Sequence, residues 1–393
     1  MTTQETIDMF DKYVIANYGR LPRVITKGEG CYLYDAEGNK ILDMFPGWAV
    51  SGLGHCHPKV VQALRKQAGE LLHIDNTFYS EPQGELAKLL SERAFGGKSF
   101  FCNSGAEANE AALKLARLYT SSEKYKFITA EGSFHGRTFA TVTATAQPKY
   151  HEGFLPLLPG FIYVPFNDID AIKQAFSNEV AAVMIEPIQG EGGINIASDE
   201  YLQTIRQLCD ENGAVMILDE VQTGIGRTGK WFGYQHSDVV PDIITMAKAL
   251  GGGVAIGAMM ASEQIAASLV PGKHASTFGG NSLACAAAIA VIEAIEEDNL
   301  LQNAVEVGQY AQEKLDQLKE KHTIIDHIRG IGMMIGVQLT SPGAKIVDKC
   351  LEKGLRINCT HDTVLRFMPA MITTKEQIDK AIEILDNVLT EGE

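Results

Sequence analysis

The sequence predicts an α/β protein, with a large domain built on a mostly parallel central sheet flanked by helices and a smaller α+β domain after it. Two observations lead to this prediction. Short, strongly apolar runs recur between residues 98 and 246, and helical patterns separate most of them. Strands that alternate with helices in this way typically form a parallel sheet. After about residue 300 the alternation ends, and a long helical pattern introduces a mixture of helices and strands.

The elements before the sheet follow from local patterns. Apolar side chains at helical spacing predict a helix within residues 5–20, and two short runs around a glycine-containing turn predict a hairpin over residues 31–43. Residues 47–55 are rich in glycine and are expected to form a loop. Amphipathic helices are predicted over residues 58–73 and 83–95. The strands predicted for the large domain are residues 98–102, 125–130, 182–185, 215–218 and 243–246.

The C-terminal part contains a predicted helix over residues 300–321, a strand near 363–367 and a final helix over 375–389. The predicted domains are therefore an N-terminal segment, residues 1–50, which packs with the small domain, a large domain, 51–299, and the small domain, 300–393.

Composition excludes several classes of partner. The net charge of −15 argues against a nucleic acid or an anionic membrane surface. No apolar run approaches the roughly 20 residues that a membrane span needs, and the N-terminus lacks the pattern of a signal peptide. The seven cysteines are odd in number and form no C-x-x-C pair, which is typical of free thiols. A cytoplasmic location is expected.

Lys248 is the first candidate for chemistry. It follows an apolar predicted strand and precedes three glycines at residues 251–253. Burial disfavours the charged form of a lysine and lowers its pKa, and a neutral amine can attack a carbonyl to form a Schiff base. The alternative is a lysine whose stem lies along apolar surface while its head reaches water.

Asp219 is the second candidate. An entirely apolar strand runs directly into Asp219 and Glu220, and open α/β sheets bind ligands at the carboxyl ends of their strands. A carboxylate placed there can hold a proton on a pyridine nitrogen, which makes the ring an acceptor of electrons. A metal-binding or structural aspartate is the alternative.

Several loops offer further candidates. Residues 103–109 follow a strand and open a helix, where free N–H groups favour a phosphate, although an ordinary capped helix explains them as well. Phe134 could stack on a planar cofactor, and Arg137 could bind a carboxylate in bidentate fashion. Glu191 lies in a glycine-rich loop, and Arg366 lies in an apolar strand, where an arginine usually needs a partner. The hydroxyls of residues 276–277 could reach a phosphate. Taken singly, each of these residues fits an ordinary loop or core position.

Two motifs indicate other functions. Residues 224–229 match G-x-G-x-x-G, so a nicotinamide-dependent dehydrogenase must be considered. Two observations count against it, because Asp219 and Glu220 would repel a pyrophosphate and residues 230–234 are a poor start for a helix. His55, Cys56 and His57 suggest zinc, but no further ligand pair completes a site, so no metal is expected.

Taken together and in order, these segments resemble the class III (subgroup II) aminotransferases, which use pyridoxal 5'-phosphate. The resemblance extends over nearly the whole chain and includes residues 53–58, 103–109, 132–138, 186–193, 218–229, 242–253 and 276–280. It implies the fold type I architecture of aminotransferases that depend on pyridoxal phosphate.

The resemblance also implies a role for each candidate. Lys248 would bind the cofactor covalently and move the substrate proton, and Asp219 would face the pyridine nitrogen. Further cofactor contacts are implied for Ser104, Gly105, Ala106, Phe134, Val221, Gln222 and Thr277, the last of these supplied by the neighbouring subunit of a homodimer. Substrate contacts are implied for Arg137, Glu191, Ser276 and Arg366. Glu191 and Arg366 would pair for a neutral-ended donor and separate when a second carboxylate enters.

Within the family, the resemblance is greatest to members that move the terminal amino group of N2-acetyl-L-ornithine to 2-oxoglutarate in arginine biosynthesis. Donors used by related members are 4-aminobutyrate, ornithine and succinylated diamines, and these stay open as alternatives. Trp48 departs from the small aliphatic residue usual at its position, and we expect its indole to narrow or reshape the pocket.

Overall fold

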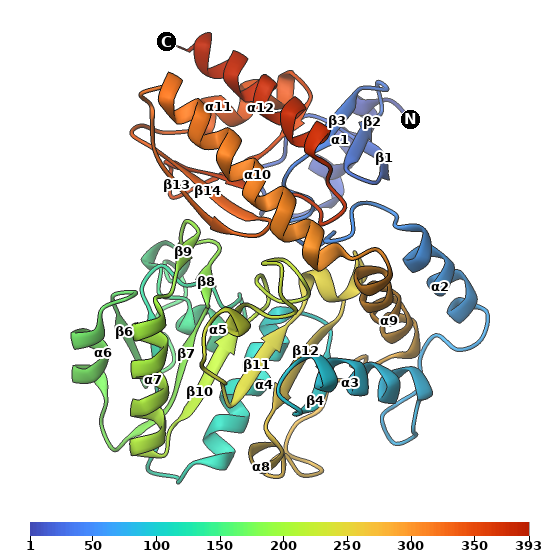
Figure 1. Cartoon of the computed structure of the whole chain (residues 1–393). Helices are drawn as coiled ribbons and strands as arrows, with labels where there is room; N and C mark the ends of the chain where they lie inside the picture. Colours follow the sequence, from blue (N-terminus) through green and yellow to red (C-terminus); the bar gives the residue numbers. More distant parts are fainter. Residues whose placement is uncertain (393) are drawn as a thin grey trace.

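The computed structural model describes residues 1–392 and is built around a seven-stranded sheet (Figure 1). Every pairing inside this sheet is parallel except the two made by β12, which runs antiparallel to both of its neighbours. The predicted, mostly parallel sheet is therefore confirmed. Its strand order is β4 (Lys98–Cys102), β12 (Gly257–Ala261), β11 (Ile243–Met246), β10 (Val215–Asp219), β7 (Val180–Ile185), β5 (Lys126–Ala130) and β6 (Phe161–Val164).

The inner strands are buried on both faces. Every residue of β7, β10, β11 and β12 is buried, which explains why these strands are continuous apolar runs without alternation. Helices cover the sheet, and α4 (Gly105–Tyr119) packs on it through small residues such as Ala108, Ala111 and Ala112. The other helices of this part are α5 (Phe139–Ala144), α6 (Ile169–Ala175), α7 (Asp199–Asn212), α8 (Glu263–Ala266) and α9 (Ser282–Glu297).

The C-terminal part forms a second layer above the large sheet in Figure 1. Its antiparallel sheet has the order β13 (Ile325–Ile331), β14 (Met334–Leu339), β17 (Val364–Phe367) and β16 (Asn358–Thr360). The helices α10 (Leu300–Lys321), α11 (Ala344–Glu352) and α12 (Lys375–Thr390) accompany it. The predicted helices over 300–321 and 375–389 and the strand near 363–367 agree with these elements.

The N-terminal strands share a sheet with the C-terminal part. The strands β1 (Ile25–Glu29), β2 (Tyr32–Asp35) and β3 (Lys40–Asp43) are followed in this sheet by β15 (Leu355–Arg356), which runs parallel to β3. In Figure 1 the blue N-terminal strands accordingly lie beside the orange and red elements. This pairing supports the predicted grouping of residues 1–50 with 300–393, of which residue 393 lies outside the described residues. The domain boundaries themselves stay predictions.

The first helices differ from the predicted ranges. Helix α1 (Thr3–Tyr13) ends well before residue 20, because Val14 has extended backbone angles. Helix α2 (Pro58–Ala68) ends five residues before His73, with Gly69 as its C-cap, and α3 covers Glu81–Arg93. The remaining elements are the pair β8 (Ile188–Gln189) and β9 (Asn195–Ile196) and the 3-10 turns η1 (Pro148–Tyr150), η2 (Gly233–His236) and η3 (Lys248–Gly251).

The sequence also led to expectations about membrane spans, metal sites and cysteines, and the structure of residues 1–392 bears on each. None of their helices is long and apolar enough to cross a membrane. In the same residues no group of three or more histidine, cysteine or acidic side chains is arranged to hold a metal ion. All seven cysteines are free thiols.

Candidate active site

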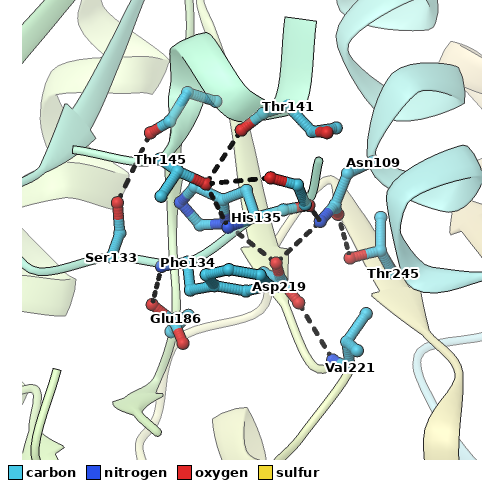
Figure 2. Close-up of polar contacts among 12 residues, drawn as sticks. Asn109, Ser133, Phe134, His135, Thr141, Thr145, Glu186, Asp219, Val221 and Thr245 are labelled. Atoms are coloured by element: carbon cyan, nitrogen blue, oxygen red, sulfur yellow. Dashed lines mark hydrogen bonds and ion pairs between the residues drawn. The ribbon is translucent and has the colours of Figure 1, made fainter. Parts of the chain in front are cut away.

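Asp219 lies at the carboxyl end of β10 and is only 3% exposed. Its Oδ2 atom accepts a hydrogen bond from Asn109 Nδ2 at 2.8 Å and lies 2.8 Å from His135 Nδ1, while Oδ1 accepts the Val221 N–H at 3.0 Å (Figure 2). Thr245 completes the arrangement, because its hydroxyl donates to Asn109 Oδ1 at 2.6 Å. A buried carboxylate is therefore held in one orientation by groups from four different segments.

The imidazole of His135 is buried beside this carboxylate. Burial on its own would lower the pKa of the imidazole, but the hydrogen bond and charge of Asp219, with the charge of Glu186, raise it above its usual value. Glu186 is buried as well, and it accepts the N–H groups of Phe134 and Gly190 at 3.1 and 3.3 Å. Burial raises the pKa of Glu186 to about 8, with His135 opposing the rise and Asp219 adding to it.

Sequence reasoning did not identify Asn109, His135, Glu186 and Thr245 as members of one site. Asn109 lies inside an alanine-rich helix, and Thr245 lies inside an apolar strand. One signal was present, since a polar side chain in an otherwise apolar segment must find a hydrogen-bond partner.

Lys248 opens the turn η3 directly after β11, with a positive φ of 43°. Burial lowers the pKa of its amine, while the charges of Glu191, Asp219 and Glu186 act in the opposite direction. The predicted lowering of the pKa therefore agrees with the structure. The glycines that follow Lys248 in the chain allow the backbone to pack closely against its neighbours, since a Cβ atom on Gly252 would lie 2.9 Å from the Val291 side chain.

The segment from Asn103 to Ala106 joins β4 to α4. Ser104 caps the helix by accepting the Glu107 N–H, which leaves the N–H groups of Gly105 and Ala106 at the helix start. A Cβ atom on Gly105 would lie 2.9 Å from Val221, so only glycine fits against that neighbour. This end of the cavity presents the donors and dipole that an anion prefers.

Arg366 is 1% exposed and forms an ion pair with Glu191, with Nη1 2.6 Å from Oε1. Its guanidinium also donates to Asn358 Oδ1 at 2.8 Å and to the Gly190 carbonyl at 3.1 Å. Burial alone would raise the pKa of Glu191, but the charge and hydrogen bond of Arg366 lower it overall. The predicted need of Arg366 for a partner is met by Glu191.

Phe134 and Arg137 are close to each other. The Arg137 guanidinium lies 5.4 Å from the ring of Phe134 and 3.9 Å from the ring of Tyr150, and these two rings meet edge to face. The stacking holds the Arg137 guanidinium, and among residues 1–392 no carboxylate pairs with it, so its N–H groups can bind one from a ligand.

These groups surround one cavity of about 480 Å³. Of the predicted site residues, its lining includes Ser104, Gly105, Ala106, Phe134, Arg137, Glu191, Asp219, Val221, Gln222 and Lys248. Arg366 stands behind Glu191. Ser276 contacts the lining residue Asn103, whose Nδ2 lies 3.2 Å from the Ser276 hydroxyl. Thr277 is exposed and does not line the cavity.

The G-x-G-x-x-G motif is not a nucleotide site. Residues 224–229 form consecutive turns, and the next helical element is the four-residue 3-10 turn η2, which is too short to receive a pyrophosphate as an α-helix does. Arg227 is buried there and donates hydrogen bonds to the carbonyls of Met333 and Met368 at 3.3 Å. The glycines allow close contact with the C-terminal part, since a Cβ atom on Gly226 would lie 2.7 Å from Met371 Sδ. The dehydrogenase alternative is therefore wrong.

Comparisons with known proteins agree with this geometry. The family model "Aminotransferase class-III" matches residues 13–389. The acetylornithine aminotransferase of Caldanaerobacter subterraneus subsp. tengcongensis is 55% identical over 97% of this chain and 98% of its own length. The acetylornithine aminotransferase of Methanocaldococcus jannaschii is 52% identical over 100% of this chain and 99% of its own length.

Solved structures give the same result. The ornithine aminotransferase of Toxoplasma gondii superposes with a TM-score of 0.95 at 32% identity, covering 100% of this chain and 96% of that one. The acetylornithine aminotransferase of Elizabethkingia anophelis superposes with a TM-score of 0.88 at 32% sequence identity, covering 100% of both chains. The chain therefore belongs to the class-III aminotransferases, enzymes that depend on pyridoxal phosphate.

Proposed function

We propose that this protein transfers the terminal amino group of N2-acetyl-L-ornithine to 2-oxoglutarate and releases N-acetyl-L-glutamate 5-semialdehyde and L-glutamate, as arginine biosynthesis requires. The observation that carries the proposal is the ion pair between Glu191 and the buried Arg366, beside the cavity that Lys248 and Asp219 line. The donor follows from similarity, because eight relatives that are 45–55% identical are acetylornithine aminotransferases.

Pyridoxal 5'-phosphate fits the residues of the cavity. The Oε1 atom of Gln222 is buried without a hydrogen-bond partner in the described residues, as expected for an atom that awaits a ligand. We assign the phosphate to Ser104, Gly105 and Ala106, at the start of α4. The ring would lie against Phe134 and Val221, with its oxygen at Gln222, its nitrogen at Asp219 and its covalent bond at Lys248.

Bound there, the cofactor supplies a carbonyl that carries the amino group and a ring that accepts electrons from the substrate carbon. The chain supplies the proton chemistry. Burial keeps the Nζ atom of Lys248 ready to accept a proton from that carbon and to return it. The side chain of Asp219 is held in place by Asn109 and His135, so its carboxylate can keep a proton on the ring nitrogen.

The two substrates of the reaction, the amino donor and the acceptor, differ in charge, and the mouth of the cavity accommodates both. Arg137 would bind the α-carboxylate of acetylornithine, whose acylated nitrogen stands on the same carbon, so the opposite, reacting end carries no carboxylate and leaves Arg366 neutralised by Glu191. When 2-oxoglutarate enters, its second carboxylate takes the place of Glu191 on Arg366. One arginine with an exchangeable partner thus serves both substrates.

We further propose a homodimer with shared active sites. Thr277 and Ser276 belong to a loop whose threonine is exposed and lies outside the cavity of its own chain. In a dimer this loop would reach the partner's site, with Thr277 at the phosphate and Ser276 at the substrate. A cytoplasmic location is proposed from the seven free cysteines.

A donor panel tests the proposal. Purified holoenzyme is supplied with 2-oxoglutarate and, in separate assays, with acetylornithine, ornithine, 4-aminobutyrate and succinylornithine, and glutamate is measured. We expect the highest kcat/KM with acetylornithine. Brisk activity on 4-aminobutyrate with none on acetylornithine would refute the donor assignment. Glutamate formation from none of the donors would refute transamination of this substrate class.

A further inference from the structure

The guanidinium of Arg366 lies against two aromatic rings that also contact each other. Its centre is 4.7 Å from the ring of Phe45 and 5.5 Å from the ring of Trp48, and the two rings meet edge to face at 5.5 Å and 70°. Phe45 is buried, whereas Trp48 is 51% exposed. Arg366 itself is only 1% exposed, so the half-exposed indole lies on the solvent side of a buried cation.

Trp48 reaches this position through an unusual backbone. Gly47, Trp48 and Ala49 have consecutive φ angles of 59°, 61° and 66°, all in the left-handed region. Only glycine adopts this region without cost, and a bulky residue there is an outlier that commonly marks a functional site. Ala49 is buried and fixes the turn from inside. The fold therefore holds Trp48 against Arg366 despite a local conformational cost.

The partners of Arg366 divide into two groups. Phe45, Trp48, the Asn358 amide oxygen and the Gly190 carbonyl contact the guanidinium directly, without the Glu191 side chain as an intermediary. Glu191 is the exchangeable partner, since it lies in a glycine-rich loop and its side-chain hydrogen bonds go to Arg366. Once a ligand carboxylate replaces Glu191, only the first group keeps the guanidinium oriented.

We propose that Trp48 determines specificity for dicarboxylates, because its ring holds the Arg366 guanidinium in place while carboxylate partners exchange. This inference rests on the proposed function and adds a residue to its acceptor half. A preorganised cation loses less freedom when it binds a carboxylate, so a ligand with two carboxylates gains from Trp48. A ligand with one carboxylate, bound at Arg137, gains nothing.

Calorimetry on the holoenzyme tests the proposal with glutarate, which has the two carboxylates of 2-oxoglutarate but no carbonyl to react. Pentanoate, of the same chain length with one carboxylate, is the matched control ligand. The variants are Trp48→Ala, Trp48→Phe, which keeps an aromatic face, and Trp48→Leu, which keeps bulk without one.

We expect Trp48→Ala and Trp48→Leu to raise the Kd of glutarate about fivefold, the size of one partly exposed cation–π contact. In Trp48→Phe the Kd of glutarate should stay within about twofold of the wild-type value. The Kd of pentanoate should be unchanged in all three variants. In steady state, the KM for the dicarboxylate acceptor should rise with that Kd, while the KM for the amino donor should not.

An unchanged glutarate Kd in Trp48→Ala, or an equal loss for pentanoate, would overturn the proposal. Wild-type affinity in Trp48→Leu would overturn its aromatic basis. A failure of the proposed function would give a different result. A protein without activity on acetylornithine could still have a glutarate Kd that depends on Trp48. An acetylornithine transaminase whose glutarate affinity ignores Trp48 would refute this inference alone.

Discussion

The floor and the mouth of the cavity are built on different principles. The floor includes Asp219, His135, Asn109 and Thr245, which lie in or beside the large sheet and hold one another through hydrogen bonds of 2.6–2.8 Å. The buried Glu186, whose charge acts on His135, also belongs to the floor. The mouth brings Glu191 and Arg366 together from segments 175 residues apart, with one ion pair between them. A single rigid sheet thus fixes the groups proposed for chemistry, while exchangeable contacts between distant segments carry the proposed specificity.

Two carboxylates in one short segment show the same difference. Glu186 accepts backbone N–H groups and lies near the charge of Asp219, and burial raises its pKa to about 8. Glu191 is five positions further along the chain, and its pKa is lowered because the charge and hydrogen bond of Arg366 outweigh burial. Neighbours in the sequence therefore have opposite shifts, because one belongs to the floor and the other to the mouth.

The largest effect is expected from Lys248→Ala. Loss of the amine removes both the proton carrier and the covalent attachment, so kcat should fall at least about 10⁴-fold. Mass spectrometry after borohydride reduction should find the cofactor on Lys248 of the wild type and on no residue of the variant. Lys98→Ala, which removes an exposed lysine paired with Glu263 at 2.9 Å, is the control and should keep full activity. Transamination at the parental rate in Lys248→Ala would refute the assignment.

Asp219→Asn changes the floor with almost no change in shape. The amide cannot supply the charge that His135 and the ring nitrogen require, and kcat should fall about 10²- to 10³-fold. The matched control is Glu220→Gln, because Glu220 accepts the N–H groups of Gly233 and Tyr234 and does not line the cavity. Steady-state rates and thermal midpoints separate the two variants. We expect Glu220→Gln to lose stability and keep most of its activity, and equal losses of activity would contradict the proposed division of roles.

Arg366→Ala affects the mouth alone. Removing the charge-assisted hydrogen bonds to the second carboxylate should raise the KM for the dicarboxylate acceptor about 10- to 100-fold, with a much smaller change in the acetylornithine half-reaction. Stopped-flow measurement of each half-reaction distinguishes the two. Arg356→Ala breaks a different ion pair of the C-terminal part, with Asp43 at 3.2 Å, and should leave both half-reactions unchanged. An equal slowing of both half-reactions by Arg366→Ala would mean that the mouth does not discriminate.

The difference between elements of the buried sheet and contacts between distant segments also explains which strands and site residues the sequence can predict. Strands buried on both faces are continuous apolar runs, so the predicted ranges of β10 and β11 agree with the structure within a residue at each end. The sequence patterns did not predict β6 and β12, because Phe161–Val164 is only half-buried and Gly257–Ala261 is mostly small residues. Lys248 and Asp219 are recognisable because each lies at or just beyond the end of a predicted strand.

The support around Asp219 is beyond the reach of local patterns. Asn109 and His135 lie 110 and 84 residues before it in the chain, and only the sheet order brings them together. The glycine motif at 224–229 misleads for a related reason, since its glycines serve close packing against Met371 rather than a ligand. A local motif cannot reveal which distant segment its backbone will approach. The pairing of Glu191 with Arg366 is implied by family resemblance, not by the residues themselves.

The smallest expected effect concerns the pH dependence of stability, to which the buried acid of the floor contributes. The pKa of Glu186 is raised from the usual 4.5 to about 8, so folding favours its protonated form. This contribution to stability is fully present below pH 4.5 and is lost as pH rises through 8. Glu186→Gln removes the titrating group, so between pH 5 and pH 9 the thermal midpoint of the cofactor-free variant should fall less than that of the wild type, by about a few degrees. Glu191→Gln is the control from the mouth, because a lowered pKa gives stability that is lost only as pH falls below 4.5, outside this window. If Glu186→Gln and the wild type lost stability in parallel over this range, Glu186 would be ionised throughout. The pKa of Glu186 would then not be raised, and the contrast with Glu191 at the mouth would disappear.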